Sequence, residues 1–132
     1  MSTFHLRVLT AEKMFFEGDV DRCIVRTVTG DVGILPNHVA YMAPVGVGGL
    51  TIYQNGKPRL AAIAQGFIEV TGAETTIIAH SCEWADEIDL HRAEQAKQRA
   101  EAQLQAKAEQ KEFAHAQIKL KKAVNRIRSA QK

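Results

Sequence analysis

The chain has 132 residues, of which 45% are hydrophobic and 24% are charged, a size that allows one compact domain with an appendage. No apolar run reaches the roughly 18 residues that cross a bilayer. The first residues lack an apolar signal region, so we expect a chain that is neither inserted nor secreted. The formal net charge of +2 is unevenly distributed. From residue 85 onward there are eleven Lys and Arg against seven Asp and Glu, so the positive charge lies in the C-terminal part.

The sequence lacks the motifs of common active sites. The five histidines are scattered without an HExxH or a Cys/His cluster, and neither GxxxxGKS/T nor GxGxxG occurs. Cys23 and Cys82 have no metal or redox spacing and lie in apolar, strand-like contexts. We interpret them as buried free thiols in a reducing compartment. We therefore predict a protein with no catalytic activity and no bound metal.

Residues 1–84 carry the pattern of short β-strands. The stretches FHLRVLT and DRCIVRTV are rich in β-branched and apolar residues with partial alternation, and the turn TGDVG follows them. Asn55 and Gly56 separate two strand-like runs and form a strong hairpin signal, since both tolerate the left-handed angles of a type I′ turn. GFIEV, TGAE and TTIIAH add another strand pair. Short strands with frequent turns predict a sandwich or a barrel.

Residues 85–132 have helical periodicity instead. From Asp86 to the end there is no Gly or Pro, and strong helix formers dominate. The polar stretch QAKAEQKE at 105–112 interrupts the apolar pattern, so we predict two helices joined in an αα-hairpin. At about 100° per residue, each helix has one apolar stripe: Leu90, Ala93, Ala96, Ala100 and Leu104 on the first, and Phe113, Ala116, Leu120, Ala123, Val124 and Ile127 on the second.

The alanines of these stripes allow close helix packing but bury little surface. Because burial contributes about 25 cal/mol per Å², an alanine methyl contributes much less than a leucine side chain. We expect a hairpin of modest stability whose helices could also dock separately on another surface. A plain, stable hairpin is the alternative.

Charged residues flank both apolar stripes. Arg92 and Arg99 lie about 20° apart on the first helix, and Asp89 precedes Arg92 by one turn. On the second helix, three cations fall within about 60° of one another: Lys119, Lys122 and Arg126. If the helices fold together, these rims form a cleft that suits a polyanion, because arginine grips phosphate bidentately and lysine adds a point charge. The alternative is a solvated face with weak ion pairs.

The whole chain resembles the epsilon subunit family of F-type ATP synthases. The resemblance rests on GDVGILPNHVAYMAP at 30–44, QGFIEV at 65–70 and IDLHRA at 88–93 in this order. It implies an α+β fold, with an N-terminal ten-stranded β-sandwich over 1–84 and a C-terminal αα-hairpin over 85–132. It also implies a non-catalytic subunit of the central stalk, which rotates between the membrane ring of c subunits and the catalytic head. The implied partners are the gamma subunit, the c-subunit ring and the alpha and beta subunits, at the cytoplasmic face of the cell membrane.

The resemblance also implies three sets of site residues. The rotor interface is Asp31, Ile34, Leu35, Pro36 and His38. ATP, as a regulatory ligand, is expected to bind the folded hairpin through Glu83, Asp89, Arg92, Arg99, Lys122 and Arg126. The inhibitory basic helix is Lys119, Lys121, Lys122, Arg126 and Arg128, which would restrain ATP hydrolysis when the hairpin opens.

The chain departs from the family pattern at four positions. Lys122 replaces a common Arg, which keeps the charge but loses the bidentate fork. Asn37 and Gln65 stand where Gly is common, and Ala40 replaces a common Pro.

A basic helix is also a footprint for nucleic acid, so a nucleic-acid-binding module is the alternative function. The acidic-leaning body and the lack of a reading motif count against it, and a membrane-surface helix is disfavoured by the many alanines.

Overall fold

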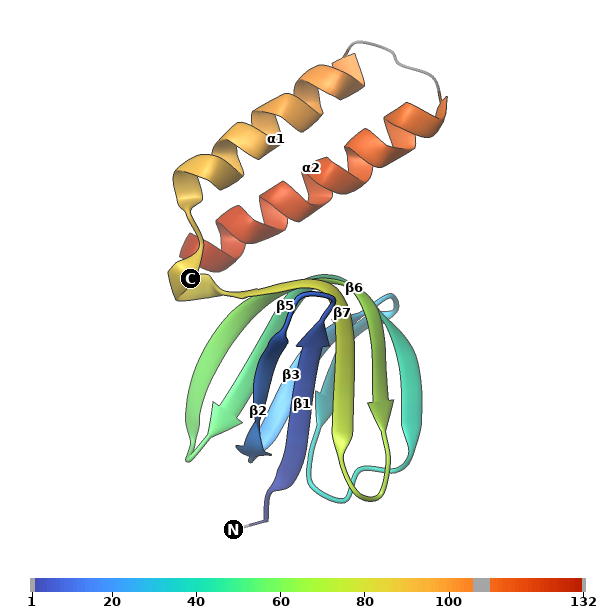
Figure 1. Ribbon diagram of the computed structural model, residues 1–132, viewed down its shortest axis with the longest axis vertical. Helices are drawn as coiled ribbons and strands as arrows, with labels where there is room; N and C mark the ends of the chain where they lie inside the picture. The colour runs from blue at the N-terminus through green and yellow to red at the C-terminus, as the bar shows by residue number, and fades with distance from the viewer. Residues whose placement is uncertain (1, 106–109, 132) are drawn as a thin grey trace. The chain divides into compact units, whose positions relative to one another are not determined.

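The computed structural model describes residues 2–105 and 110–131, without the side chains of 105 and 110–113. The chain divides into two compact units, Met1–Trp84 and Ala85–Lys132. The first is a β-sandwich and the second is a hairpin of two helices (Figure 1). Phe113, which we placed in the second apolar stripe, has a side chain outside the described residues.

Alternating apolar residues produce the strands of the first unit. Within the described residues, seven strands form one sheet in the order β2-β1-β7-β6-β5-β3-β4. Neighbouring strands are antiparallel except β1 and β7, which pair in parallel. The strands are β1 Phe4–Thr10, β2 Met14–Val20, β3 Arg22–Thr27, β4 Gly30–Ile34, β5 Tyr41–Gln54, β6 Lys57–Val70 and β7 Thr75–Trp84.

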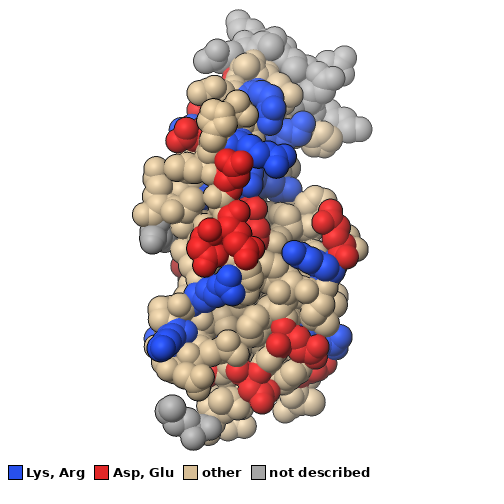
Figure 2. Space-filling model, turned by 60° about the vertical axis from the view of Figure 1, so that its left-hand side comes forward, with Lys and Arg blue, Asp and Glu red and all other residues tan. Residues whose placement is uncertain are grey.

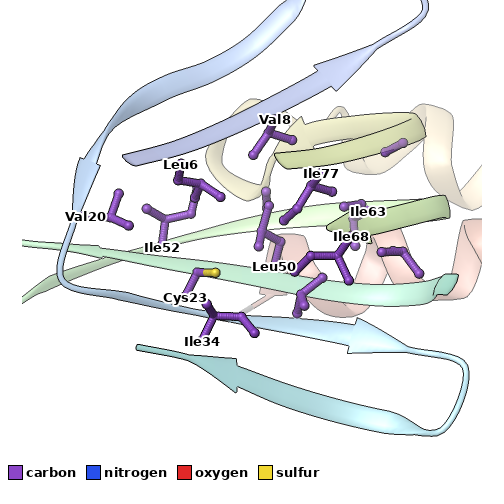
Figure 3. Packing of buried hydrophobic residues seen from close by; sticks show 14 of the residues in the cluster. Leu6, Val8, Val20, Cys23, Ile34, Leu50, Ile52, Ile63, Ile68 and Ile77 are labelled. Atoms are coloured by element: carbon purple, nitrogen blue, oxygen red, sulfur yellow. The ribbon is translucent and has the colours of Figure 1, made fainter. Parts of the chain in front are cut away.

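The sheet folds back on itself, which brings β2 close to the end of β5. The Asp21 amide donates to the Tyr53 carbonyl at 2.8 Å, and Gln54 Nε2 donates to the Asp19 carbonyl at 3.0 Å. Buried aliphatic side chains from all seven strands fill the space between the two layers (Figure 3). Burial of these side chains is the main stabilising contribution to the unit.

The predicted count of ten strands is not confirmed. Pairing is interrupted along one line, where Gly46, Gln65 and His80 have no partner in the ladder. Gln65 has a φ of 52° there, and a Cβ placed on the next residue, Gly66, would overlap the Ile78 carbonyl oxygen. The strands β5, β6 and β7 bend at this line but continue through it. If each of these three strands were counted as two, the sheet would have ten strands. The predicted and observed counts therefore differ in whether β5, β6 and β7 are treated as continuous.

The tight turns follow the local residue preferences. Asn55 and Gly56 connect β5 to β6 with φ values of 52° and 75°, so the predicted type I′ turn is confirmed. Asn37 has a φ of 64°, which asparagine tolerates better than most residues. Asn37 thus adopts a left-handed conformation that glycine would otherwise favour.

The second unit contains η1 (Ala85–Glu87), α1 (Leu90–Gln105) and α2 (Gln110–Gln131). The two helices pack against each other and η1 packs against α2. The fully buried hydrophobic residues described in the hairpin are alanines: Ala93 and Ala100 on α1, and Ala116 and Ala123 on α2. Leu90 and Ile118 are 36% and 38% exposed. Neither helix, over its described residues, has the length and apolar character that crossing a membrane requires.

Candidate functional site

Two arginines lie to one side of the alanine face of α1. Ala93 and Ala100 mark the buried face of this helix. At about 100° per residue, Arg92 and Arg99 fall roughly a quarter turn from that face and about 20° from each other. Both side chains are exposed. The helix therefore presents two guanidinium groups along one edge.

Three cations lie to the same rotational side of α2. Lys119, Lys122 and Arg126 are displaced from the buried Ala116 and Ala123 in the sense that Arg92 and Arg99 are displaced on α1. When two antiparallel helices pack face to face, residues that are displaced in the same rotational sense from the two packed faces lie along the same edge of the pair. Figure 2 shows lysine and arginine side chains gathered over the helices. We call this set the basic edge: Arg92, Arg99, Lys119, Lys122 and Arg126.

The opposite edge of the hairpin confirms this geometry. A shallow cavity there is lined from α1 by Glu94, Lys97, Gln98 and Glu101, and from α2 by Ile127 and Gln131. These α1 residues lie on the side of the helix away from Arg92 and Arg99. Lys97 Nζ lies 4.0 Å from Glu101 Oε1, so charges on this edge are partly balanced. The hairpin thus has one basic and one mixed edge.

Most of the basic edge lacks internal counter-charges. Among the described residues, Arg92, Arg99 and Lys122 form no ion pair, whereas Arg126 has an interaction within the chain. Lys122 and Arg126 are half-buried. Unneutralised cations beside each other repel, and an anion bound between them would relieve that repulsion.

Asp89 caps the first helix. It directly precedes α1, its Oδ1 accepts the Arg92 amide at 3.2 Å, and its carbonyl accepts the Ala93 amide at 3.0 Å. Asp89 was predicted to be one more charge of the cleft, although an Asp before a helical pattern is an N-cap signal. Glu83, the remaining predicted ATP residue, is half-buried on β7 and belongs to the first unit.

The predicted inhibitory residues do not share one face. Lys119, Lys122 and Arg126 belong to the basic edge, whereas Lys121 and Arg128 lie on the far side of α2, away from Ala123. Lys121 and Arg128 are exposed. Cations therefore cover two sides of this helix.

The predicted rotor-interface residues surround a turn after β4. The His38 amide donates to the Leu35 carbonyl at 3.2 Å, and Pro36 precedes Asn37 with its positive φ, as in a type II turn. Leu35 is exposed, and Pro36 and His38 are half-buried. Ile34 instead is completely buried in the core, so it supports this turn from beneath and offers no surface.

Asp31 is paired, a feature that the sequence analysis missed. It lies opposite Arg26 in the β3–β4 ladder, and Arg26 Nε donates to Asp31 Oδ1 at 2.7 Å while Nη2 donates to Oδ2 at 3.4 Å. The Arg26 side chain lies against Gly48, where an added Cβ would overlap it. The exposed carboxylate is thereby held in one orientation.

An apolar surface of the sheet also escaped the sequence analysis. Leu9 pairs with Met14 and with Ile78, and Phe67 pairs with Ile78 and with Pro44. Paired residues point to the same face, and Phe67 and Ile78 are 57% and 58% exposed. The Val28 amide donates to the Pro44 carbonyl at 3.2 Å. We call this row the apolar band: Met14, Leu9, Ile78, Phe67, Pro44 and Val28.

The described residues hold no cluster of three or more metal-ligating side chains. Cys23 and Cys82 are free, and burial raises the pKa of each thiol to about 12. Neither thiol is therefore a nucleophile at neutral pH.

A sandwich and a charged, alanine-packed hairpin define a known class of protein. Residues 3–85 match the beta-sandwich domain, and residues 86–131 the long alpha-helix domain, of the ATP synthase delta/epsilon chain. The chain therefore belongs to the ATP synthase delta/epsilon chain family.

Its relatives place it more narrowly among epsilon chains. The chain is 46% identical to the ATP synthase epsilon chain of Ruminococcus albus, over 100% of this chain and 99% of the relative. The fold is shared with a chain of the Euglena gracilis mitochondrial ATP synthase (OSCP/F1/c-ring), with a TM-score of 0.85 and 21% identity. The match covers 98% of this chain and 82% of the Euglena chain. The fold is also shared with a chain of the Tetrahymena thermophila mitochondrial ATP synthase central stalk and c-ring, with a TM-score of 0.69, 13% identity and coverage of 98% and 97%.

Proposed function

We propose that the chain is the epsilon subunit of the central stalk of a proton-translocating F-type ATP synthase, where it couples the c-subunit ring to the catalytic head. Its similarity to an epsilon chain over the full length supports this role. Two of the solved structures that share its fold come from assemblies containing a c-ring. The proposed partners are the gamma subunit, the c-ring and the alpha and beta subunits. The subunit would be peripheral, at the cytoplasmic face of the membrane.

The apolar band is the proposed surface for the gamma subunit. Five neighbouring apolar side chains on the strands, with Val28 in the adjoining β3–β4 turn, support an interaction site, since isolated soluble proteins rarely expose such patches. The turn with Leu35, Pro36 and His38, together with Asp31, would meet the c-ring. Because Arg26 already pairs with Asp31, the c-ring would contact a carboxylate of fixed orientation beside a guanidinium group.

Copurification tests the apolar band. Phe67→Ser with Ile78→Ser should abolish copurification of gamma with the tagged chain, while surface substitution leaves the fold largely intact. Ile118→Ser, at an exposed apolar position of the hairpin, is the matched control and should retain gamma. Retention of gamma by the double variant would show that the band is not the interface.

The basic edge is the proposed site for regulatory ATP. Two arginines that form no ion pair with the described residues and two half-buried cations on the facing helix suit a triphosphate, and this arrangement carries the regulatory proposal. Binding would hold the two helices together, because the anion joins charges from both. Free ATP at ten times its dissociation constant would stabilise the closed hairpin by about 1.4 kcal/mol. A hairpin packed through alanines is marginal enough to respond to that amount.

Calorimetric titration with ATP tests this site. Arg92→Ala with Arg99→Ala should weaken ATP binding by at least about tenfold. Each lost hydrogen bond to a charged group costs about 1.5–3 kcal/mol, and less where the group is exposed to solvent. Lys97→Ala removes a cation from the opposite edge and should leave the affinity unchanged. If the double variant and Lys97→Ala lost affinity for ATP equally, the effect would be one of net charge alone. If the double variant lost no affinity, the basic edge would not be the ATP site.

The opened α2 is the proposed inhibitory element. Its lysines and arginines would meet acidic residues of the catalytic subunits and restrain ATP hydrolysis, so that high ATP releases the restraint. Replacement of Lys119, Lys121 and Arg128 by alanine should raise ATP hydrolysis by the assembled enzyme at low ATP. Replacement of Glu94 and Glu101, two charged residues on the mixed edge of α1, should not raise it. Unchanged hydrolysis in the α2 variant would contradict the restraint.

A further inference from the structure

A charged cluster joins the two strands β1 and β2 at the edge of the sheet. The imidazole of His5 lies between two carboxylates of β2: its Nε2 is 2.9 Å from Glu17 Oε2, and its Nδ1 is 3.2 Å from Asp19 Oδ1. Ionised carboxylates only accept hydrogen bonds. Both ring nitrogens must therefore donate, which makes His5 an imidazolium ion in this arrangement.

The same oxygen of Glu17 lies near a second donor. Glu17 Oε2 is 3.7 Å from Arg7 Nε, which is too far for a hydrogen bond. Arg7 Nε is buried and has no hydrogen-bond partner among the described residues, an unfavourable state for an N–H group. The other end of the guanidinium is held by Glu74, since Arg7 Nη1 donates to Glu74 Oε1 at 3.5 Å. Two donors therefore compete for one oxygen of Glu17, and His5 is the one bonded to it.

We propose that His5 and Arg7 form a proton-operated switch for the Glu17 carboxylate, which bonds His5 when the imidazole is protonated and Arg7 Nε when the imidazole is neutral. A neutral imidazole has one N–H and one lone pair. One of its two carboxylate contacts must then break, because a lone pair and a carboxylate oxygen repel each other. The proton goes from His5 to solvent, and no covalent bond other than that N–H changes.

The available partners decide which contact breaks. Within the described residues, the Asp19 carboxylate is bonded to His5 and to no other side chain, whereas Glu17 has Arg7 Nε as an alternative. A small movement of Glu17 would give the buried Nε its missing acceptor and would leave the Asp19 contact intact. Neutral His5 should therefore keep its remaining proton on Nδ1.

The charged groups that face His5 set the pH at which the switch operates. They are Arg7 beside it on β1, Glu17 and Asp19 on β2, and Glu74 directly before β7. The hydrogen bond with Glu17, followed by that with Asp19, raises the pKa of His5 above its ordinary value of 6.5. Glu17 therefore leaves His5 as the pH rises through this higher pKa.

The switch lies beside the apolar band. Arg7 pairs with Glu17, and Leu9 pairs with Met14. Residues two apart on a strand point to the same face, so the row that contains Arg7 and Glu17 borders the band. Protonation of His5 thus changes the direction of a carboxylate at the edge of that surface. The switch acts within the chain and does not require the proposed contact with gamma.

Heteronuclear NMR of the full chain during a pH titration tests the switch. The Nε–H signal of Arg7 should shift downfield as the pH rises, with the same midpoint as His5, and neutral His5 should be the Nδ1–H tautomer. His5→Gln and Glu17→Ala should each abolish the shift at Arg7. Glu69→Ala is the matched control, because Glu69 lies in the same row beyond Thr76, and it should leave both signals as in the wild type.

A further variant and three results decide the outcome. Asp19→Asn should lower the pKa of His5 and move the midpoint at Arg7 equally, since both signals report one proton. An Arg7 signal that stays constant while His5 titrates would overturn the switch, and so would a neutral His5 with its proton on Nε2. Persistence of the Arg7 shift in His5→Gln would also overturn it, because another group would then be the cause.

Discussion

The alanine interface of the hairpin gives the sharpest test of how its packing controls its function. Ala93, Ala100, Ala116 and Ala123 are at most 2% exposed. Each buried methyl contributes about 0.8 kcal/mol, so the four together contribute about 3 kcal/mol. Alanine contacts allow an interaxial distance near the short end of about 8–10 Å. A larger side chain must push the helices apart.

Ala100→Leu should therefore remove most of this packing. Overpacking of a close-packed site costs about 1–3 kcal/mol, which is comparable to the contribution of all four methyls. The control is Ala102→Leu, an exposed position on the same helix, because Ala and Leu have similar helix propensities. We expect the thermal transition of the helices to fall by at least about 5 °C in Ala100→Leu and to stay unchanged in the control.

Two optical signals separate the hairpin from the sandwich. Far-ultraviolet circular dichroism follows the helices. The fluorescence of Trp84, the only tryptophan in the sequence, reports on the sandwich. The centre of its ring lies 4.5 Å from that of Phe15 and 3.8 Å from the Arg59 guanidinium carbon. Only the helical signal should shift, and ATP should bind Ala100→Leu more weakly because the closed state is less populated. An unshifted helical transition, or an equal shift in both signals, would refute the reasoning.

Three further predictions concern the sandwich. Gly66→Ala should destabilise the chain by more than about 3 kcal/mol in urea unfolding, since the methyl meets the backbone of β7; Gly33→Ala, where nothing lies within 4 Å of the added atom, should cost little, and similar values for the two would contradict the packing. The side-chain hydrogen bond with Glu17 is the largest cause that raises the pKa of His5 above 6.5, so its stabilisation is full below the unfolded pKa and is lost as the pH rises through the higher folded pKa. A histidine NMR titration should show this pKa, and Glu17→Gln should lower it; a wild-type pKa at or below 6.5 would disprove the contact. Because burial raises the pKa of Cys82 to about 12, alkylation of the native chain at neutral pH should be slow and should accelerate only on unfolding.

Local patterns predicted the parts of the fold that depend on neighbours in sequence. Alternating apolar residues indicated the strands, Asn55 and Gly56 indicated their type I′ turn, and the alanine stripes indicated the helix contact. These features depend on side-chain periodicity and backbone preference, which a single sequence contains.

Features that depend on register could not be predicted in the same way. The apolar band combines residues as distant as Met14 and Ile78, which become neighbours only through Leu9 and the ladder order. Ile34 and Leu35 are adjacent apolar residues, and only the end of β4 at Ile34 decides which is buried and which is exposed. The Asp89 cap, by contrast, was present as a local signal and was missed because the residue was counted within the helix.

The overlap between the two proposed cation sets explains how ATP and inhibition would be coupled. Lys122 and Arg126 belong both to the ATP set and to the inhibitory set, and a cation that binds phosphate cannot also bind a carboxylate of the catalytic subunits. Lys121 and Arg128, on the far side of α2, are not engaged by the closed cleft. ATP would therefore oppose inhibition in two ways, by holding the helices together and by neutralising the shared charges. Since Lys122 lacks the arginine fork, both the binding of ATP and the competition it exerts would be weaker here than with arginine at this position.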